Sequence, residues 1–244
     1  MDEKLIKKEP LGREFFINVT KNHAFGTDAV LLADFAKPKT RDRLCDLGTG
    51  CGIIPFLMLR DGKLSSAVGV DISDEAIFLA EKTASELNLQ NFKAVNCDLK
   101  ELKGKVEFGC HTLVTCNPPY KAAGAGLKNP NQRAMVARHE VACCLEDIIA
   151  VSAKLLQTSG RLCICHRPER LSELICLMSS YKIEPKRLRT VAQRRGEEPW
   201  LVLVEGKRCA NKGLRIEPTL YIEENGSFSK EMLEIYGPYK EAYL

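Results

Sequence analysis

The sequence predicts an α/β fold in which helices cover both faces of a mostly parallel sheet. From residue 41 onward, short apolar runs alternate with amphipathic helical stretches, which is the pattern of β-α units. A glycine-rich turn follows the first apolar run, and an acidic residue stands near the end of each of the next two. The strands of such a sheet are buried on both faces, and ligands bind at their carboxyl ends.

The predicted elements follow one another without an internal repeat. Ser73 is expected to cap a helix whose small and apolar residues, from Ala76 to Leu87, share one face. Pro168 suits the first turn of a later helix. The predicted strands cover residues 43–46, 67–72, 92–97, 111–116, 161–165 and 200–205, and further helices are expected at 52–59 and 142–156.

The two ends of the chain lie outside this alternation but are expected to belong to the same domain. The prediction is therefore one domain, 1–244, with an N-terminal prefix (1–40), a core (41–206) and a C-terminal extension (207–244). In the prefix, FGTDAVLLADFA predicts a helix with one apolar face. Thr27 is its expected N-terminal cap, and the charge of Asp28 suits the positive end of the helix.

The composition is that of an ordinary globular protein, with 45% hydrophobic and 28% charged residues in 244. No apolar run reaches the roughly 18 residues of a membrane span, and the charged start MDEKLIKKEP does not resemble a secretory signal. The eleven cysteines contain no C-x-x-C pair, so they are expected to be reduced thiols and not metal ligands. We expect a cytoplasmic protein with no metal, and a monomer is favoured.

Positive charge is concentrated in two segments. Residues 121–138 carry a net charge of +4 and residues 182–195 a net charge of +5, against +4 for the whole chain. The remainder is therefore net negative. Two basic segments on such a background are the pattern of a nucleic-acid binder, although two solvated surface faces would have the same composition.

A glycine-rich turn, DLGTGCG, follows the first predicted strand and leads into a helix. Gly48, Gly50 and Gly52 allow a tight turn and a close approach of a ligand to the backbone. A dinucleotide fold has G-x-G-x-x-G at this place, whereas this chain has D-x-G-x-G-x-G. The spacing therefore favours a nucleoside ligand over a dinucleotide.

Acidic residues complete the predicted cofactor site. Asp71 is placed to accept hydrogen bonds from ribose hydroxyls, Asp98 to reach an adenine amino group, and Asp46 to favour an ammonium group over a phosphate. A ligand with adenosine at one end and an amino acid at the other is S-adenosylmethionine, and the pattern resembles the Rossmann-like class I methyltransferases. The predicted contacts are Thr27, Asp28, Asp46, Gly48, Gly50, Gly52, Asp71, Ile72 and Asp98.

The fourth strand of the core ends in Asn117, Pro118, Pro119 and Tyr120. This N-P-P-Y motif resembles that of amino-methyltransferases acting on planar nitrogens. The Asn117 side-chain carbonyl and the Pro118 backbone carbonyl can each accept one N–H of such an amine and direct its lone pair at the methyl group. The prolines keep these acceptors in place, and Tyr120 can stack on a flat substrate. These four residues are the predicted catalytic site.

Several further segments, HAFGTDAVLLADF, DIS, ARHE, RPERL, EPKRLR and GSFSKE, resemble bacterial tRNA adenine-N6 methyltransferases over nearly the whole chain. The resemblance implies methylation of N6 of an unpaired adenine 3′ to the anticodon, at position 37 of a valine tRNA. The tRNA would be held by Lys121, Lys128, Arg133 and Arg138, and by the second basic segment. Two alternatives stay open: a glutamine N5 methyltransferase acting on a protein such as a release factor, and a non-catalytic RNA-binding relative.

Overall fold

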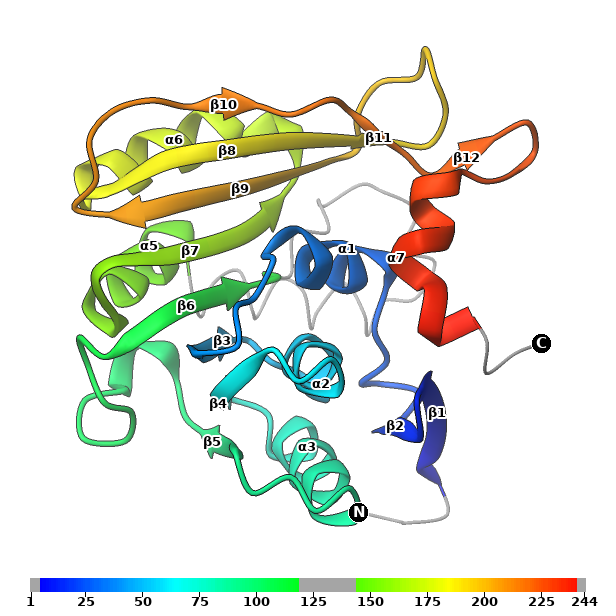
Figure 1. Cartoon of the computed structure of the whole chain (residues 1–244). Coiled ribbons are helices and arrows are strands. Elements are labelled where there is room, and N and C mark those ends of the chain that lie inside the picture. Colours follow the sequence, from blue (N-terminus) through cyan, green and yellow to red (C-terminus); the bar gives the residue numbers. More distant parts are fainter. Residues whose placement is uncertain (1–4, 119–143, 241–244) are drawn as a thin grey trace.

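The centre of the molecule is a nine-stranded sheet (Figure 1). The structure, a computed structural model, describes residues 5–118 and 144–240. The strands of the sheet within these residues are β3 (Asp42–Leu47), β4 (Leu64–Asp71), β5 (Phe92–Asn96), β6 (His111–Cys116), β7 (Leu156–His166), β8 (Ile183–Ala192), β9 (Leu201–Arg208), β10 (Arg215–Ile216) and β11 (Leu220–Tyr221).

Their order is β10-β8-β9-β7-β6-β3-β4-β5, with β11 also paired to β8. β9 runs antiparallel to both of its neighbours, and the other pairs within the sheet are parallel. The prediction of a mostly parallel sheet is therefore confirmed. Because β8 lies beyond β9 and is antiparallel to it, β8 ends at the same edge as β7.

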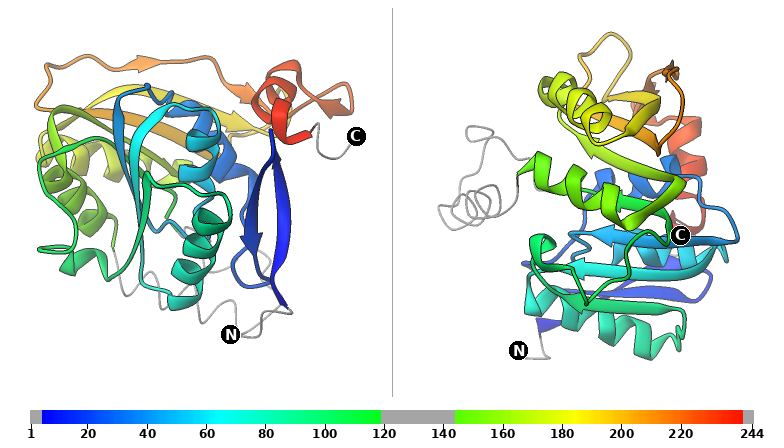
Figure 2. Two further views of the ribbon diagram at one scale, coloured as in Figure 1. Left: turned by 60° about the horizontal axis from the view of Figure 1, so that its bottom comes forward. Right: turned by 90° about the vertical axis from the view of Figure 1, so that its left-hand side faces the viewer.

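Helices cover both faces of the sheet. α1 (Thr27–Phe35), α2 (Ile53–Arg60) and α3 (Asp74–Glu86) pack with one side of the strands in a first apolar cluster. α5 (Leu145–Leu155) and α6 (Leu171–Ser180) pack with the other side in a second cluster. The right-hand view of Figure 2 shows α5 and α6 on one side of the sheet. Short 3₁₀ turns lie at Leu99–Glu101 and Pro168–Arg170.

The two chain ends pack together beside the first cluster. β1 (Lys7–Gly12) and β2 (Phe15–Val19) form an antiparallel hairpin, and α7 (Lys230–Lys240) contacts both β1 and α1. The left-hand view of Figure 2 shows the hairpin next to α7. A second small hairpin, β12 (Glu223–Glu224) with β13 (Ser227–Phe228), precedes α7. Residues of the prefix and of the extension thus pack in the first apolar cluster.

The structure corrects the sequence prediction at two places. β8 was predicted only as a basic segment, because its lysines and arginines mask the buried residues Ile183, Leu188 and Val191. The cap of α1 is Gly26 and not Thr27, which is the first residue of the helix. Ser73 does cap α3, since its hydroxyl accepts a hydrogen bond from the Ala76 N–H. The cysteines among the described residues are all free.

A largely buried ionic network joins α1 to the strands. Arg161 of β7 contacts Asp42 at 2.8 Å and Glu205 at 3.0 Å. Arg187 of β8 contacts Glu205 and Glu217, each at 3.2 Å. Both guanidinium groups also donate to backbone carbonyls at the C-terminal end of α1, where the helix dipole favours positive charge. The network therefore links β3, β7, β8 and β9 through one set of paired charges.

Removing one member of this network should cost much more than removing an exposed ion pair. Arg161→Ala leaves Asp42 and Glu205 without their shared cation, and we expect it to lower the free energy of unfolding by about 3–5 kcal/mol. Arg170→Ala, which breaks an exposed pair with Glu173, should cost about 1 kcal/mol or less. Urea unfolding measures both values, and equal small losses would contradict a structural role for the network.

Candidate active site

Two of the predicted site residues that the structure describes, Asp46 and Asn117, lie on one face of the sheet at its carboxyl edge. Alternate residues of a strand point to the same face, and β3 and β6 pair with Asp46 opposite Thr115. On the next strand, Thr115 is opposite Cys163, so Asn117 lies beside Cys165. This face is the one that α1 and α2 cover. The sheet register therefore places the acid of the glycine turn and the asparagine of N-P-P-Y on one surface.

The glycine turn has the left-handed backbone that its composition predicts. The φ angles of Gly48, Gly50 and Gly52 are 68°, 55° and 90°. At Gly52 an added Cβ would lie 2.6 Å from the Phe56 ring, so this glycine is required for packing. At Gly48 and Gly50 a Cβ would meet no described atom within 4 Å. The backbone of these two residues is therefore open to a ligand.

Asp71 holds the turn in place from the end of β4. One carboxylate oxygen accepts the Gly50 N–H at 2.8 Å and the other accepts the Ser73 N–H at 2.9 Å. Each oxygen keeps a further lone pair, so the predicted contact with ribose hydroxyls is compatible with both bonds. Ile72 follows directly and is 49% exposed, which leaves an apolar surface next to this carboxylate. Asp71 thus has a structural role that the sequence did not indicate.

Asp46 is a buried carboxyl group with an unused acceptor. Its Oδ1 accepts the Thr115 hydroxyl at 2.6 Å, and burial raises its pKa to about 7. The hydroxyls of Thr115 and Thr49 act in the opposite direction and lower that pKa. The Thr49 hydroxyl and Oδ2 of Asp46 are both buried, and neither has a partner of normal hydrogen-bond geometry among the described residues. A buried acceptor of this kind fits the cationic ammonium group of an amino-acid ligand.

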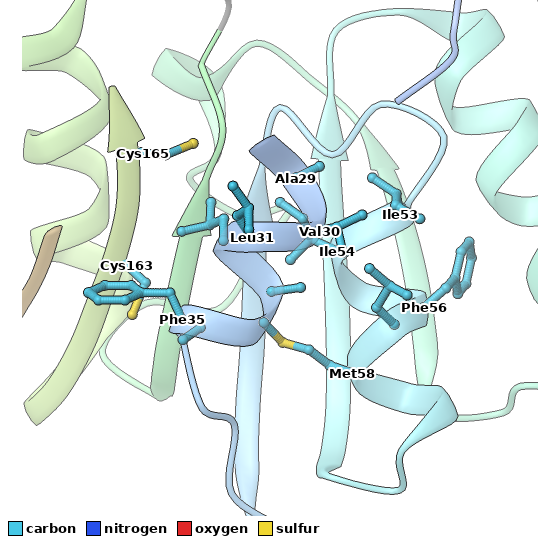
Figure 3. Close-up of a cluster of buried hydrophobic side chains, with 14 of the residues drawn as sticks. Ala29, Val30, Leu31, Phe35, Ile53, Ile54, Phe56, Met58, Cys163 and Cys165 are labelled. Carbon is cyan, nitrogen blue, oxygen red and sulfur yellow. The ribbon is translucent and has the colours of Figure 1, made fainter. Parts of the chain in front are cut away.

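The remaining predicted cofactor residues lie at the margins of this surface. The Asp98 carboxylate accepts the Lys100 N–H at 2.9 Å, just beyond β5. Asp28 accepts the Ala29 N–H at 2.9 Å, and the Thr27 hydroxyl accepts the Tyr236 hydroxyl of α7 at 3.0 Å. Figure 3 shows the Ala29 end of α1 on the side of Cys165, with Phe35 at the other end of the helix. The N-terminus of α1 therefore lies at the carboxyl edge.

Asn117 and Pro118 come directly after β6. Asn117 is half-buried and Pro118 is buried. The Cys165 thiol donates a hydrogen bond to Oδ1 of Asn117, with 3.0 Å between sulfur and oxygen. The other predicted catalytic and RNA-binding residues lie outside the described part of the chain: Pro119, Tyr120, Lys121, Lys128, Arg133 and Arg138.

Sequence reasoning missed several residues that the structure brings to this edge. Thr115 and Cys165 would have been found from the two-residue period of their strands, because each shares a face with a predicted site residue. His23 could not be found this way. Its Nε2 lies 3.1 Å from the Ser73 hydroxyl, which brings the segment before α1 against the start of α3. That contact joins residues 50 positions apart.

The second basic segment does not form a continuous cationic surface. Arg187 belongs to the buried network, Arg189 contacts Glu231 of α7 at 2.6 Å, and Arg194 contacts Glu223 at 2.6 Å. The Arg195 guanidinium lies over the Tyr221 ring. Much of the charge of residues 182–195 thus joins β8 to the C-terminal extension, and the expectation that this segment also holds phosphates stays a prediction.

Known methyltransferases match both the sequence and the fold. The sequence pattern of the methyltransferase domain family matches residues 38–201, which is more than half of the chain. The chain belongs to this methyltransferase family.

Within the residues that the structure describes, no cluster of three or more His, Cys, Asp or Glu side chains is placed to hold a metal ion. In the same residues, no helix is long and apolar enough to span a membrane.

Several curated relatives of this methyltransferase carry the name tRNA1(Val) (adenine(37)-N6)-methyltransferase. The protein from Aeromonas hydrophila is 24% identical over 88% of this chain and 89% of its own length. The protein from Porphyromonas gingivalis is 27% identical over 88% of this chain and 87% of its own length. A relative from a Flavobacteriaceae bacterium is 28% identical, but over 57% of each chain. The resemblance found in the sequence motifs is thus confirmed.

Solved structures confirm the Rossmann-like class I fold. A predicted O-methyltransferase from Agrobacterium tumefaciens covers 87% of this chain and 97% of its own, with a TM-score of 0.68 and 19% identity. A geranyl diphosphate methyltransferase solved with S-adenosylmethionine covers 74% of this chain and 84% of its own, with a TM-score of 0.52 and 15% identity. Membership of the methyltransferase family confirms the prediction of a methyltransferase that uses S-adenosylmethionine as methyl donor.

Because Asp46 is buried, we expect the substitution Asp46→Asn to raise the free energy of unfolding of the methyltransferase but to weaken its cofactor binding. The carboxyl pKa is near 3.9 in an unfolded chain and about 7 in the fold. The folded state therefore binds more protons between these values, and stability should fall by a few kcal/mol as pH rises from about 4 to 7. Asp46→Asn should remove this slope and be more stable than wild type at pH 8.

The same substitution should weaken S-adenosylmethionine binding by about 1.5–3 kcal/mol, the scale of a hydrogen bond to a charged group. Urea unfolding across pH and titration calorimetry at pH 8 measure the two effects. Asp74→Asn changes an exposed carboxyl group and should keep the wild-type pH slope. Unchanged cofactor affinity in Asp46→Asn would remove Asp46 from the cofactor contact.

Proposed function

We propose that this methyltransferase transfers a methyl group to N6 of an unpaired adenine in tRNA, at position 37 of a valine tRNA. The observation that carries the proposal is the placement of Asn117 on the same face and edge as Asp46 and the open glycine turn. The names of the relatives support tRNA as the substrate class. A tRNA substrate also agrees with the predicted cytoplasmic location.

The chemistry requires the adenine amine to be aimed at an electrophilic methyl group, which S-adenosylmethionine supplies when bound. An exocyclic amine is a weak nucleophile because its lone pair is delocalised into the ring. Oδ1 of Asn117 and the Pro118 carbonyl would each accept one of its N–H groups and direct the lone pair out of the ring plane. Acceptors fixed before the reaction cost no reorganisation in the transition state. The methylated amine then loses its proton to solvent.

The same cofactor surface is proposed to hold the donor. Asp71 would accept the ribose hydroxyls, Asp98 the adenine amino group, and Oδ2 of Asp46 the ammonium group. The N-terminus of α1 would hold the carboxylate, since the free N–H groups of a helix start favour anions. Gly48 and Gly50 leave the space in which the donor would lie against the backbone.

A base in a tRNA loop suits this arrangement because it is already unpaired. Extruding it costs less than flipping a base out of a duplex. Tyr120 is proposed as the stacking platform, worth about 1–3 kcal/mol for one base. Phosphate contacts are assigned to Lys121, Lys128, Arg133 and Arg138. These assignments rest on the sequence.

One assay separates tRNA from the alternative substrate. The protein is incubated with radiolabelled S-adenosylmethionine and either unmodified total tRNA or a release factor, and the labelled nucleoside is identified after digestion. We expect label in N6-methyladenosine at position 37 of valine tRNA. Label on a glutamine amide would favour the protein substrate, which brings the same pair of N–H donors. Label in neither would favour the non-catalytic reading.

The contribution of Asn117 has a direct test. Asn117→Ala should bind the cofactor normally, because its side chain faces the substrate, and should lower the single-turnover rate by about 10²–10³. Asn91→Ala, at the opposite edge of the sheet, is the control and should react at the wild-type rate. A wild-type rate in Asn117→Ala would refute the proposed role of its carbonyl.

The basic residues should affect tRNA binding without affecting the cofactor. Reversing Lys128 and Arg133 to glutamate should weaken tRNA binding and flatten its salt dependence, because fewer counterions are released from the RNA. Filter binding at several salt concentrations measures the slope, and calorimetry should give the wild-type cofactor affinity. A salt slope equal to that of the wild type would leave these residues as ordinary surface charge.

A further inference from the structure

A buried thiol contacts the side chain on which the proposed chemistry depends. Cys163 and Cys165 alternate on β7, point to the face covered by α1, and have no exposed surface (Figure 3). Cys163 faces the ionic network, with its sulfur 3.7 Å from Oε2 of Glu205. Cys165, two residues further along, donates to Oδ1 of Asn117 at 3.0 Å. The two thiols are equally buried, but one contacts Glu205 and the other contacts Asn117.

The contact matters because an amide side chain can rotate. The backbone of β6 is fixed by its pairing with β3 and β7, but that pairing leaves the terminal torsion of Asn117 broad. Rotation about this torsion exchanges the carbonyl oxygen with the NH₂ group. Only the oxygen can accept an amine N–H, so one of the two orientations is competent for the proposed reaction.

A thiol at this point favours the competent orientation. The Cys165 S–H is a donor, although a weak one, and the Asn117 oxygen is its acceptor. A carbonyl oxygen has two lone pairs, so one hydrogen bond from Cys165 leaves the second for the substrate. Two residues earlier on β6, the Thr115 hydroxyl donates a hydrogen bond to Asp46 of β3, on the side of the strand away from β7. The strand end is therefore held on both sides before any substrate arrives.

We propose that Cys165 is a positioning residue for methyl transfer, which holds the Asn117 carbonyl toward the substrate amine through its thiol. The proposal rests on the proposed function, since it assigns Cys165 a part in the role given to Asn117. Cys165 has no exposed surface, so it would itself touch neither the substrate nor the donor. Its effect should therefore appear in the rate of transfer and not in cofactor affinity.

Three variants distinguish positioning from packing. Cys165→Ala removes the donor, and Cys165→Ser keeps a donor of similar size. Cys163→Ala removes an equally buried thiol from the same strand and face without touching Asn117. Thermal unfolding of each full-length variant reports the packing loss. Single-turnover rates at saturating tRNA and cofactor, with calorimetry of S-adenosylmethionine, report the functional effect.

We expect Cys165→Ala to lower the single-turnover rate by about two- to tenfold, the effect of one net hydrogen bond. Cys165→Ser should recover most of the rate, and Cys163→Ala should keep the wild-type rate despite a similar loss of thermal stability. In an Asn117→Ala background, Cys165→Ala should add no further loss. Equal rates for Cys165→Ala and Cys163→Ala, or full additivity with Asn117→Ala, would overturn the proposal.

A measurement without substrate separates this inference from the proposed function. The side-chain amide resonances of Asn117, assigned by NMR through their absence in Asn117→Ala, should shift in Cys165→Ala and remain near their wild-type positions in Cys163→Ala. Unmoved resonances in Cys165→Ala would refute the contact whether or not tRNA is methylated. If the wild-type protein methylates no tRNA adenine but the resonances shift as expected, the proposed function fails and the positioning of Asn117 stands.

Discussion

β3 pairs in parallel with β4 on one side and with β6 on the other, and this pairing fixes the positions of the other elements. It brings the ends of three strands to one edge, so Asp71, Asp46 and Asn117 meet there although they are far apart in the chain. The hydrogen bond from Thr115 to Asp46 joins β3, which leads into the glycine turn, to the strand of the predicted catalytic motif. A shift of one residue in this register would turn these side chains to the opposite face.

The same constraint has an energetic cost. Asp46 is buried where its charge is disfavoured, and its second oxygen has no partner of normal geometry among the described residues. A fold selected for stability alone would place an amide or an apolar residue there. A local cost of this kind is compensated elsewhere in the fold. In this chain the two apolar clusters are in a position to supply that stability.

The C-terminal extension is coupled to the site through contacts that are distant in sequence. α7 packs on α1, and the Tyr236 hydroxyl reaches Thr27 at the start of that helix, 209 residues away. Arg189 of β8 is held by Glu231 of α7. Positive charge that resembles an RNA-binding segment in the sequence therefore serves partly to attach the extension, and the N-terminus of α1 is supported by the end of the chain.

Local patterns in the sequence are enough to predict the fold class, the glycine turn and most of the strand ends, because these follow from hydrophobic period and glycine spacing. The sequence also placed Asp46, Asp71 and Asn117, since residues at the ends of parallel strands must share an edge. It could not determine the partner of each charge. The arginines of β8 mask its buried face, and nothing in the sequence indicates that Asp71 accepts the Gly50 N–H. Hydrogen bonds such as Cys165 to Asn117 depend on register and side-chain direction between strands, and only the tertiary structure decides these.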